Sequence, residues 1–193
     1  ARVRDTLRAE GGNVLTGAFA PLASFALFHM VTVFPLSWVF LFTSEGIARF
    51  LLIETISAFF GMAAIVASGM IADRIGRKSL LMGSAIGIAA FSGFAPQLLD
   101  AGPVGEAVFM ILGFVLLGLS FGQSSGAVAS RFSKAYRYTG AAITSDLAWL
   151  FGAGFAPLAA LLLATHFGLM AAGAYLLSGA VCTVAALWYA DRL

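Results

Sequence analysis

Three ionisable side chains, His29, Glu54 and Asp146, lie inside long apolar stretches of the sequence. A charge near the centre of a membrane-spanning helix costs about 2.5–3.5 kcal/mol on insertion scales, so such groups usually face the bundle interior and serve a function there. Carboxyl groups and imidazoles exchange protons, and histidine does so near physiological pH. The three residues are therefore candidate proton-coupling groups.

Each of these groups also has a structural alternative. Glu54 shares a helical face with small residues as far as Gly61, so its carboxyl group is expected to point into a bundle. For Glu54 the alternative is a structural hydrogen bond or a charge near the outer mouth of the bundle. For His29 it is a satisfied buried imidazole. For Asp146 the sequence leaves proton coupling and substrate binding both open.

Four further residues are candidates for lining a substrate site. Arg49 lies one helical turn from Glu54, so it either pairs with that acid, attracts an anionic substrate, or is a screened surface charge. Gln123 and Ser124 offer hydrogen bonds, and Trp149 offers an aromatic wall. We expect them to line a central polar site.

The densest group of charges is the segment G-x-x-x-D-R-x-G-R-K over residues 69–78. Its defining residues are Gly69, Asp73, Arg74, Gly76, Arg77 and Lys78. Apolar runs lie on both sides of the segment, and each is long enough to cross a hydrocarbon core of about 30 Å. The pattern predicts a tight basic hairpin between two membrane helices, which glycine allows to turn sharply.

The elements that carry these residues follow from the apolar composition. Hydrophobic residues make up 61% of the 193 residues, against about 45–50% in soluble domains. Six continuous apolar runs are each long enough for a membrane-spanning helix. They are residues 14–42, 47–72, 79–99, 104–130, 139–165 and 168–189. We predict an all-α integral membrane protein, a single six-transmembrane-helix bundle over residues 1–193 that is embedded in a lipid bilayer.

The charges predict the orientation of the bundle. With six crossings, ten of the eleven Lys and Arg residues fall on one side, and only Arg49 falls on the other. Glu45, Asp100, Glu106 and His166 are then expected on the side of Arg49. The positive-inside rule places the basic side, and with it both termini, in the cytoplasm. The sequence therefore predicts a multi-pass protein of the plasma membrane, the inner membrane in a bacterium.

Glycine and other small residues recur at helical spacing in two of the predicted spans. The two stripes are Gly118, Gly122 and Gly126 in the fourth span, and Gly61, Ala64 and Ser68 in the second. Stripes of this kind allow membrane helices to approach closely. Pro21 and Pro35 lie within the first predicted span, where each permits a bend.

The common enzyme and nucleic-acid classes find no support in the sequence. The sequence has two histidines and one cysteine, and it contains neither the H-E-x-x-H motif of zinc proteases nor the G-x-S-x-G motif of serine hydrolases. We expect no metal site, no cofactor, no enzymatic activity and no nucleic-acid partner.

The segment at residues 69–78 resembles the cytoplasmic loop signature of the major facilitator superfamily of transporters. Residues 136–141 (Y-R-Y-T-G-A) and 152–158 (G-A-G-F-A-P-L) resemble the eleventh helix of its metabolite:proton symporter family, and residues 121–123 resemble the tenth. The resemblance implies a C-terminal half of the fold, family helices seven to twelve. Two departures are a Ser-Arg-Phe-Ser sequence at residues 130–133, where the family usually has Glu-Leu-Phe-Pro, and Asp146 in place of an amide.

This resemblance implies half of a secondary active transporter that moves a small organic acid or zwitterionic metabolite with protons. Transport would use alternating access, in which two six-helix bundles rock around a site near the membrane midplane. Asp73 would latch the cytoplasmic side by meeting a helix N-terminus of the other half. The bases beside it either pair with acids and lipid headgroups or only set topology.

Six helices supply only half of the wall of a transport cavity, so we expect a partner that supplies the other half. The chain begins at Ala1 without methionine, so we expect a processed or cut piece that needs its N-terminal six-helix half, or a second copy. The main alternative is an independent six-helix channel or lipid-handling protein, which stable and active assembly of this chain alone would favour. An integral-membrane enzyme is the third possibility.

Overall fold

The computed structural model describes the backbone of residues 2–43, 46–150 and 156–190, with side chains except at 95–96, 124–128, 156–157 and 189–190. Every regular element in these ranges is helical. The elements are α1 Val3–Phe19, α2 Leu22–Phe42, α3 Ile47–Ile75, α4 Arg77–Phe94, η1 Ala95–Asp100, α5 Pro103–Ala129, α6 Arg137–Trp149, α7 Ala156–Phe167 and α8 Leu169–Ala190. Long apolar runs form helices because a helix satisfies its backbone hydrogen bonds internally. The predicted all-α fold class is confirmed.

Five helical segments within the described residues are long and apolar enough to cross a membrane. They are Val3–Phe42, Ile47–Ile75, Arg77–Asp100, Pro103–Gln123 and Leu169–Trp188. The remaining predicted span, 139–165, covers α6, a segment outside the described residues, and α7, of which Leu158–Phe167 is a shorter apolar helix. An all-helical membrane bundle therefore stands, and the count of six crossings remains a prediction.

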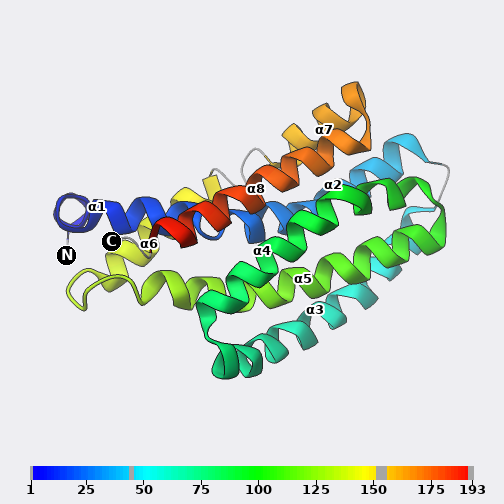
Figure 1. Cartoon of the computed structure of the whole chain (residues 1–193). Helices are drawn as coiled ribbons and strands as arrows, with labels where there is room; N and C mark the ends of the chain where they lie inside the picture. Colours follow the sequence, from blue (N-terminus) through cyan, green and yellow to red (C-terminus); the bar gives the residue numbers. More distant parts are fainter. Residues whose placement is uncertain (1, 44–45, 151–155, 191–193) are drawn as a thin grey trace.

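The first predicted span differs from the structure at its beginning. Helix starts at Val3 rather than at residue 14, because the polar residues that precede the apolar run still form helix. Glu10 has non-helical torsions (φ −135°, ψ 34°), and Figure 1 shows the first turns of α1 across the direction of the rest. A second break lies before α2, at Pro21. Close to this break, the Ala23 N–H donates to Thr183 Oγ1 of α8 at 2.9 Å.

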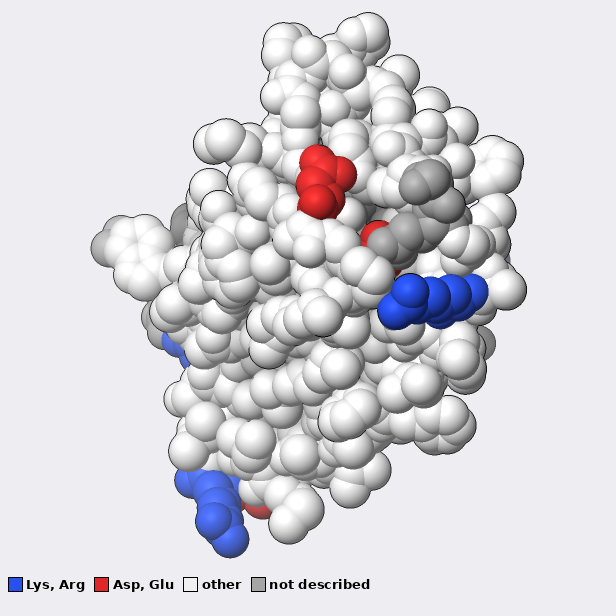
Figure 2. Space-filling model, turned by 90° about the vertical axis from the view of Figure 1, so that its right-hand side faces the viewer, with Lys and Arg blue, Asp and Glu red and all other residues white. Residues whose placement is uncertain are grey.

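The connections alternate between the two ends of the bundle (Figure 1). The N-terminus, the end of α8 and the α3–α4 and α5–α6 connections lie toward one end, and the α4–α5 and α7–α8 connections lie toward the other. Figure 2 looks at this second end and shows a surface with few charged side chains. The predicted separation of the basic connections from the others matches this arrangement.

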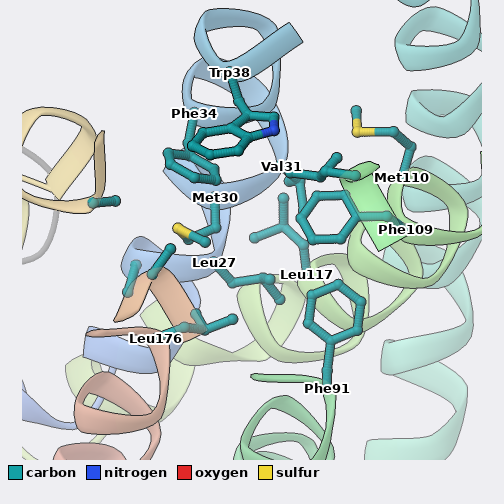
Figure 3. Close-up of a cluster of buried hydrophobic side chains, with 14 of the residues drawn as sticks. Leu27, Met30, Val31, Phe34, Trp38, Phe91, Phe109, Met110, Leu117 and Leu176 are labelled. Carbon is teal, nitrogen blue, oxygen red and sulfur yellow. The ribbon is translucent and has the colours of Figure 1, made fainter. Parts of the chain in front are cut away.

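The core is built around α2. Leu27, Met30 and Val31 are at most 1% exposed, and they pack with Phe91 of α4 and Phe109 of α5 in the cluster of Figure 3. Dispersion contacts are individually small but numerous in such a core. They hold the helices in lipid, where burial of apolar area drives no association.

The two small-residue stripes pack against each other where α3 meets α5. A Cβ atom at Gly118 would overlap with the carbonyl oxygen of Gly61 and approach Ala64 Cβ to 2.7 Å. A Cβ atom at Gly122 would overlap with Ser68 Oγ. The prediction of close helix contact is confirmed for these residues, whereas the Gly126 position lies outside the described side chains.

Candidate functional site

An aromatic cluster forms where α2, α5 and α6 meet. Its members are Phe25, Phe28 and His29 of α2, Phe121 of α5 and Trp149 of α6. The ring centroids of Phe25 and Trp149 are 4.4 Å apart, and Phe28 meets Trp149 edge-on at 5.8 Å. Aromatic pairs at such separations contribute about 0.5–1.5 kcal/mol beyond area burial. The cluster therefore joins two predicted site residues, His29 and Trp149, that are 120 positions apart in the sequence.

The imidazole of His29 lacks hydrogen bonds in this cluster. Its ring centroid lies 5.3 Å from that of Phe28 and 6.2 Å from that of Trp149. Both ring nitrogens are buried, and neither has a partner among the described residues. Leaving a buried polar group unsatisfied costs about 1–3 kcal/mol. The described residues therefore do not supply the hydrogen bonds that a satisfied buried imidazole requires.

The other residue predicted on α6 lies at the surface. Asp146 precedes Trp149 by one helical turn, and its side chain is exposed. Trp149 itself is 37% exposed although its ring packs on the cluster. The side chain of Asp146 thus lies on a surface that the described residues leave open.

Glu54 occupies an intermediate environment on α3. Its side chain is half-buried, and Ser57 and Gly61 on the same face are buried against the bundle. This burial agrees with the predicted orientation of the small-residue face. Arg49, at the start of α3, is exposed.

Gln123 lies deeper in the bundle, where α5 crosses α3. Its Nε2 donates a long hydrogen bond of 3.5 Å to Ser68 Oγ, which in turn donates to the Ile65 carbonyl oxygen at 2.5 Å. A Cβ atom on Gly69 would lie 3.9 Å from the same Nε2. The first glycine of the loop motif therefore adjoins a predicted lining residue. The side chain of Ser124 lies outside the described residues.

A cavity of about 220 Å³ opens between α2, α3 and α5. Its wall includes Phe28 and Phe121 of the aromatic cluster, and Ala58 and Met62 of α3. Ligand pockets in proteins typically measure about 300–1,000 Å³. The cavity is therefore large enough for part of a small molecule, and it borders the aromatic cluster.

The basic hairpin is confirmed as a turn between two helices. Gly76 ends α3 with φ 88°, and its N–H donates to the Ala72 carbonyl oxygen at 2.8 Å. Glycine adopts this left-handed φ without the steric penalty of a side chain. The next helix begins at once with Arg77. Asp73 and Lys78 are both exposed at this turn, where a partner or a membrane surface can reach them.

A second turn at the same end is held by residues that the sequence analysis did not single out. Asn13 of α1 donates through Nδ2 to the Arg131 carbonyl oxygen at 3.2 Å. Phe132 is 1% exposed and packs beside Val14. A Cβ atom at Gly140 would come within 2.5 Å of the Phe132 ring, so glycine is required for this close approach. The only sequence signal for the contact was the apolar Phe132 within a polar loop.

Glu106, which the sequence analysis placed on the outer side of the membrane, is buried within the bundle. It lies in the first turn of α5 and is 1% exposed, and its side of the membrane stays a prediction. The helix begins at Pro103, a residue type favoured at the first helical position. A carboxylate is stabilised near a helix N-terminus, and this preference was the available signal.

Comparisons with known proteins identify relatives among bacterial transport proteins. The inner membrane metabolite transport protein YhjE of Escherichia coli is 32% identical over 201 residues, which cover 97% of this chain and 46% of that protein. Two Haemophilus influenzae proteins, each named provisionally as a metabolite transport protein, are 36% and 30% identical. They match over 65% and 90% of this chain, and over 28% and 42% of their own lengths.

The chain thus spans less than half the length of each of these relatives. No family model matches it, and no solved structure matches it. The relatives and the helical membrane architecture agree with the resemblance to transporters. This chain therefore belongs to the family of these bacterial metabolite transport proteins, of which it matches part of the length.

Proposed function

We propose that this chain is the C-terminal half of a secondary active transporter of the major facilitator superfamily, and that the transporter moves a small organic acid or zwitterion together with a proton. The observation that carries the proposal is the basic hairpin at residues 69–78, whose glycine turn and exposed charges lie between two membrane helices. The length relation to YhjE supports the assignment to a half. The N-terminal half of the same protein is the proposed partner.

Alternating access requires a half that moves as one body. The close packing of Gly118 against Gly61 favours such rigidity, and so does the bond of Asn13 to the α5–α6 connection. The proposed cycle rocks this bundle against its partner around a site near the midplane. Asp73 latches the closed cytoplasmic side through the N-terminus of a helix in the partner half.

Proton coupling in this proposal uses Glu54, with His29 and Asp146 as further candidates. Glu54 combines a half-buried position with a small-residue face toward the bundle. Gln123 and Trp149 contribute an amide and an aromatic face to the substrate site, with Arg49 attracting anions at its mouth. The proposed orientation places both termini in the cytoplasm of a bacterium, with the transporter in the inner membrane.

The test is uptake of labelled organic acids by vesicles that contain the full-length parent protein. Accumulation that rises with an imposed inward proton gradient, and disappears with an uncoupler, supports the proposal. Uptake that ignores the gradient excludes proton symport and leaves a uniporter or exchanger. Vesicles without the protein provide the background.

A further inference from the structure

A groove opens between α1 and α8, toward the end of the bundle where the chain begins. Its volume is about 440 Å³, within the range of about 300–1,000 Å³ that ligand pockets occupy. Leu15 and Phe19 of α1 line one side of the groove, and Cys182 and Ala186 of α8 line the other. Both Leu15 and Phe19 are exposed, so the groove is open to the surroundings of the bundle.

The wall of this groove is apolar. Among its described lining residues only Thr16 carries a hydroxyl group, and that group donates to the Gly12 carbonyl oxygen at 2.9 Å. The thiol of Cys182 behaves as a small apolar group. A polar ligand would lose its hydrogen bonds to water here without replacing them. The groove therefore suits a hydrocarbon chain.

The length of the groove favours a lipid chain over a membrane-spanning helix. From Gly12 to Phe19 the rise along α1 is about 11 Å, at about 1.5 Å per residue. One leaflet contributes about 15 Å to a hydrocarbon core of about 30 Å. The groove thus matches most of one leaflet, whereas a helix of a partner would cross both.

The first turns of α1, immediately before the groove, are basic. They carry three exposed arginines, among them Arg4 and Arg8, against one exposed acid, Asp5. The carboxylate of Glu10 is engaged by the Ser133 N–H instead. The segment therefore presents a net positive charge to its surroundings, which favours an anionic lipid surface.

The same turns have the orientation of a segment at a membrane surface. They lie across the direction of the rest of α1 (Figure 1), and the break is at Glu10. Val3 and Leu7, one helical turn apart, are exposed beside the arginines. Apolar and basic side chains on one helix are typical of segments that lie in the plane of the headgroups.

One phospholipid is long enough to reach both the groove and the arginines. Arg8 precedes Gly12 by four residues, so their Cα atoms are at most about 14 Å apart even in a fully extended chain. A phospholipid spans about 20 Å from headgroup to chain end, half of a bilayer of about 40–45 Å.

We propose that the groove between α1 and α8 binds one acyl chain of an anionic phospholipid, and that Arg4 and Arg8 bind its phosphate group. Guanidinium groups bind phosphate through paired, charge-assisted hydrogen bonds. The bound lipid holds the first turns of α1 at the membrane surface. This inference goes beyond the proposed function and does not depend on it.

The first test measures lipid binding to the purified, delipidated full-length protein by native mass spectrometry. The probes are dioleoyl-phosphatidylglycerol and dioleoyl-phosphatidylcholine, which share their chains and differ in net charge. Phosphatidylglycerol is expected to bind at least about fivefold more tightly. Arg8→Gln is expected to weaken its binding about fivefold, because one base near the headgroup is lost. The control, Arg49→Gln, removes the same charge at the start of α3 and is expected to leave the binding unchanged.

The second test fills the groove and leaves the arginines unchanged. Ala186→Leu enlarges a side chain of the groove wall, and Ala174→Leu makes the same change at an exposed position of α8. Phosphatidylglycerol binding is expected to fall at least about fivefold in Ala186→Leu only, because the acyl chain loses its space. This pair keeps the inference testable even where Arg8→Gln does not fold.

The inference is overturned if the two lipids bind equally well, or if Arg8→Gln binds phosphatidylglycerol as Arg49→Gln does. Equal binding by Ala186→Leu and Ala174→Leu also overturns it, and this result is expected if a helix of a partner covers the groove. None of these measurements involves transport, so their failure leaves the proposed function standing. Selective binding in a protein that takes up no organic acid rejects the proposed function and keeps the lipid site.

Discussion

The carboxylate of Glu10 accepts the backbone N–H of Ser133, with the two carboxylate oxygens 3.2 and 3.3 Å from the nitrogen. The two residues are 123 positions apart and belong to α1 and to the α5–α6 connection. The connection therefore depends on the start of the chain for part of its hydrogen bonding. This contact occurs in the region where the sequence departs from the Glu-Leu-Phe-Pro pattern.

Removing this carboxylate is expected to loosen the α5–α6 connection. In Glu10→Leu the amide of Ser133 loses its acceptor, so amide hydrogen exchange of residues 130–136 should become faster in the full-length protein. Glu10→Gln keeps one acceptor oxygen, so its exchange rate should lie between those of the unmodified protein and Glu10→Leu. Asp5→Leu is the control, because Asp5 is an exposed acid of the same helix. Equal exchange in all four proteins contradicts a role for Glu10 in holding the connection.

Enlarging Gly118 is expected to destabilise the α3–α5 contact. A Cβ atom there overlaps backbone rather than a movable side chain, and overpacking of this kind costs about 1–3 kcal/mol. Gly118→Ala should therefore lower the melting temperature of the purified protein. The matched control is Gly83→Ala in α4, where a Cβ atom meets nothing within 4 Å. That exchange should be neutral or stabilise by up to about 1 kcal/mol, from helix propensity. A Gly118→Ala melting temperature no lower than that of the control refutes the packing argument.

Neutralising Asp73 is expected to lower transport without preventing membrane insertion. An interaction between a carboxylate and a helix N-terminus contributes about 0.3–1 kcal/mol, and up to about 2 kcal/mol when partly buried. Its loss in Asp73→Asn corresponds to a roughly two- to thirtyfold decrease in initial uptake rate. Quantitative blotting of membranes checks that the amount of inserted protein is unchanged. Uptake equal to that of the unmodified protein removes the latch from the proposal.

The orientation of the bundle is testable with single thiols. In a protein whose Cys182 has been replaced by serine, cysteines at Lys78 and Lys134 should react with a membrane-impermeant maleimide only from the cytoplasmic side. A cysteine at Gly102, in the α4–α5 connection, should react from the opposite side. Opposite reactivity of the first two positions is incompatible with the charge-based topology.

Much of the architecture could be predicted because lipid makes continuous apolar runs informative. The hairpin at Gly76 and the stripes containing Gly61 and Gly118 were visible as spacing alone. Helix beginnings were harder to predict: α1 extends to Val3 through residues whose polarity hides them from an apolar-run criterion.

The candidate site was less accessible to sequence reasoning. His29 and Trp149 were recognised separately, but their ring contact depends on how α2 and α6 cross. Periodicity within one helix carries no information about that crossing. Likewise, the Glu10 contact involves an amide proton that any residue at position 133 other than proline would supply.

Because of the break at Pro21, α2 depends on α8 for one of its backbone hydrogen bonds. The Ala23 amide, in the first turn of α2, finds its acceptor on Thr183 of α8. A chain shortened to end after α7 would leave the Ala23 N–H without a hydrogen-bond acceptor, because lipid tails offer none. Versions of this chain that lack α8 are therefore poor starting points for expression. Circular permutants that retain α8 beside α2 keep the hydrogen bond between Ala23 and Thr183.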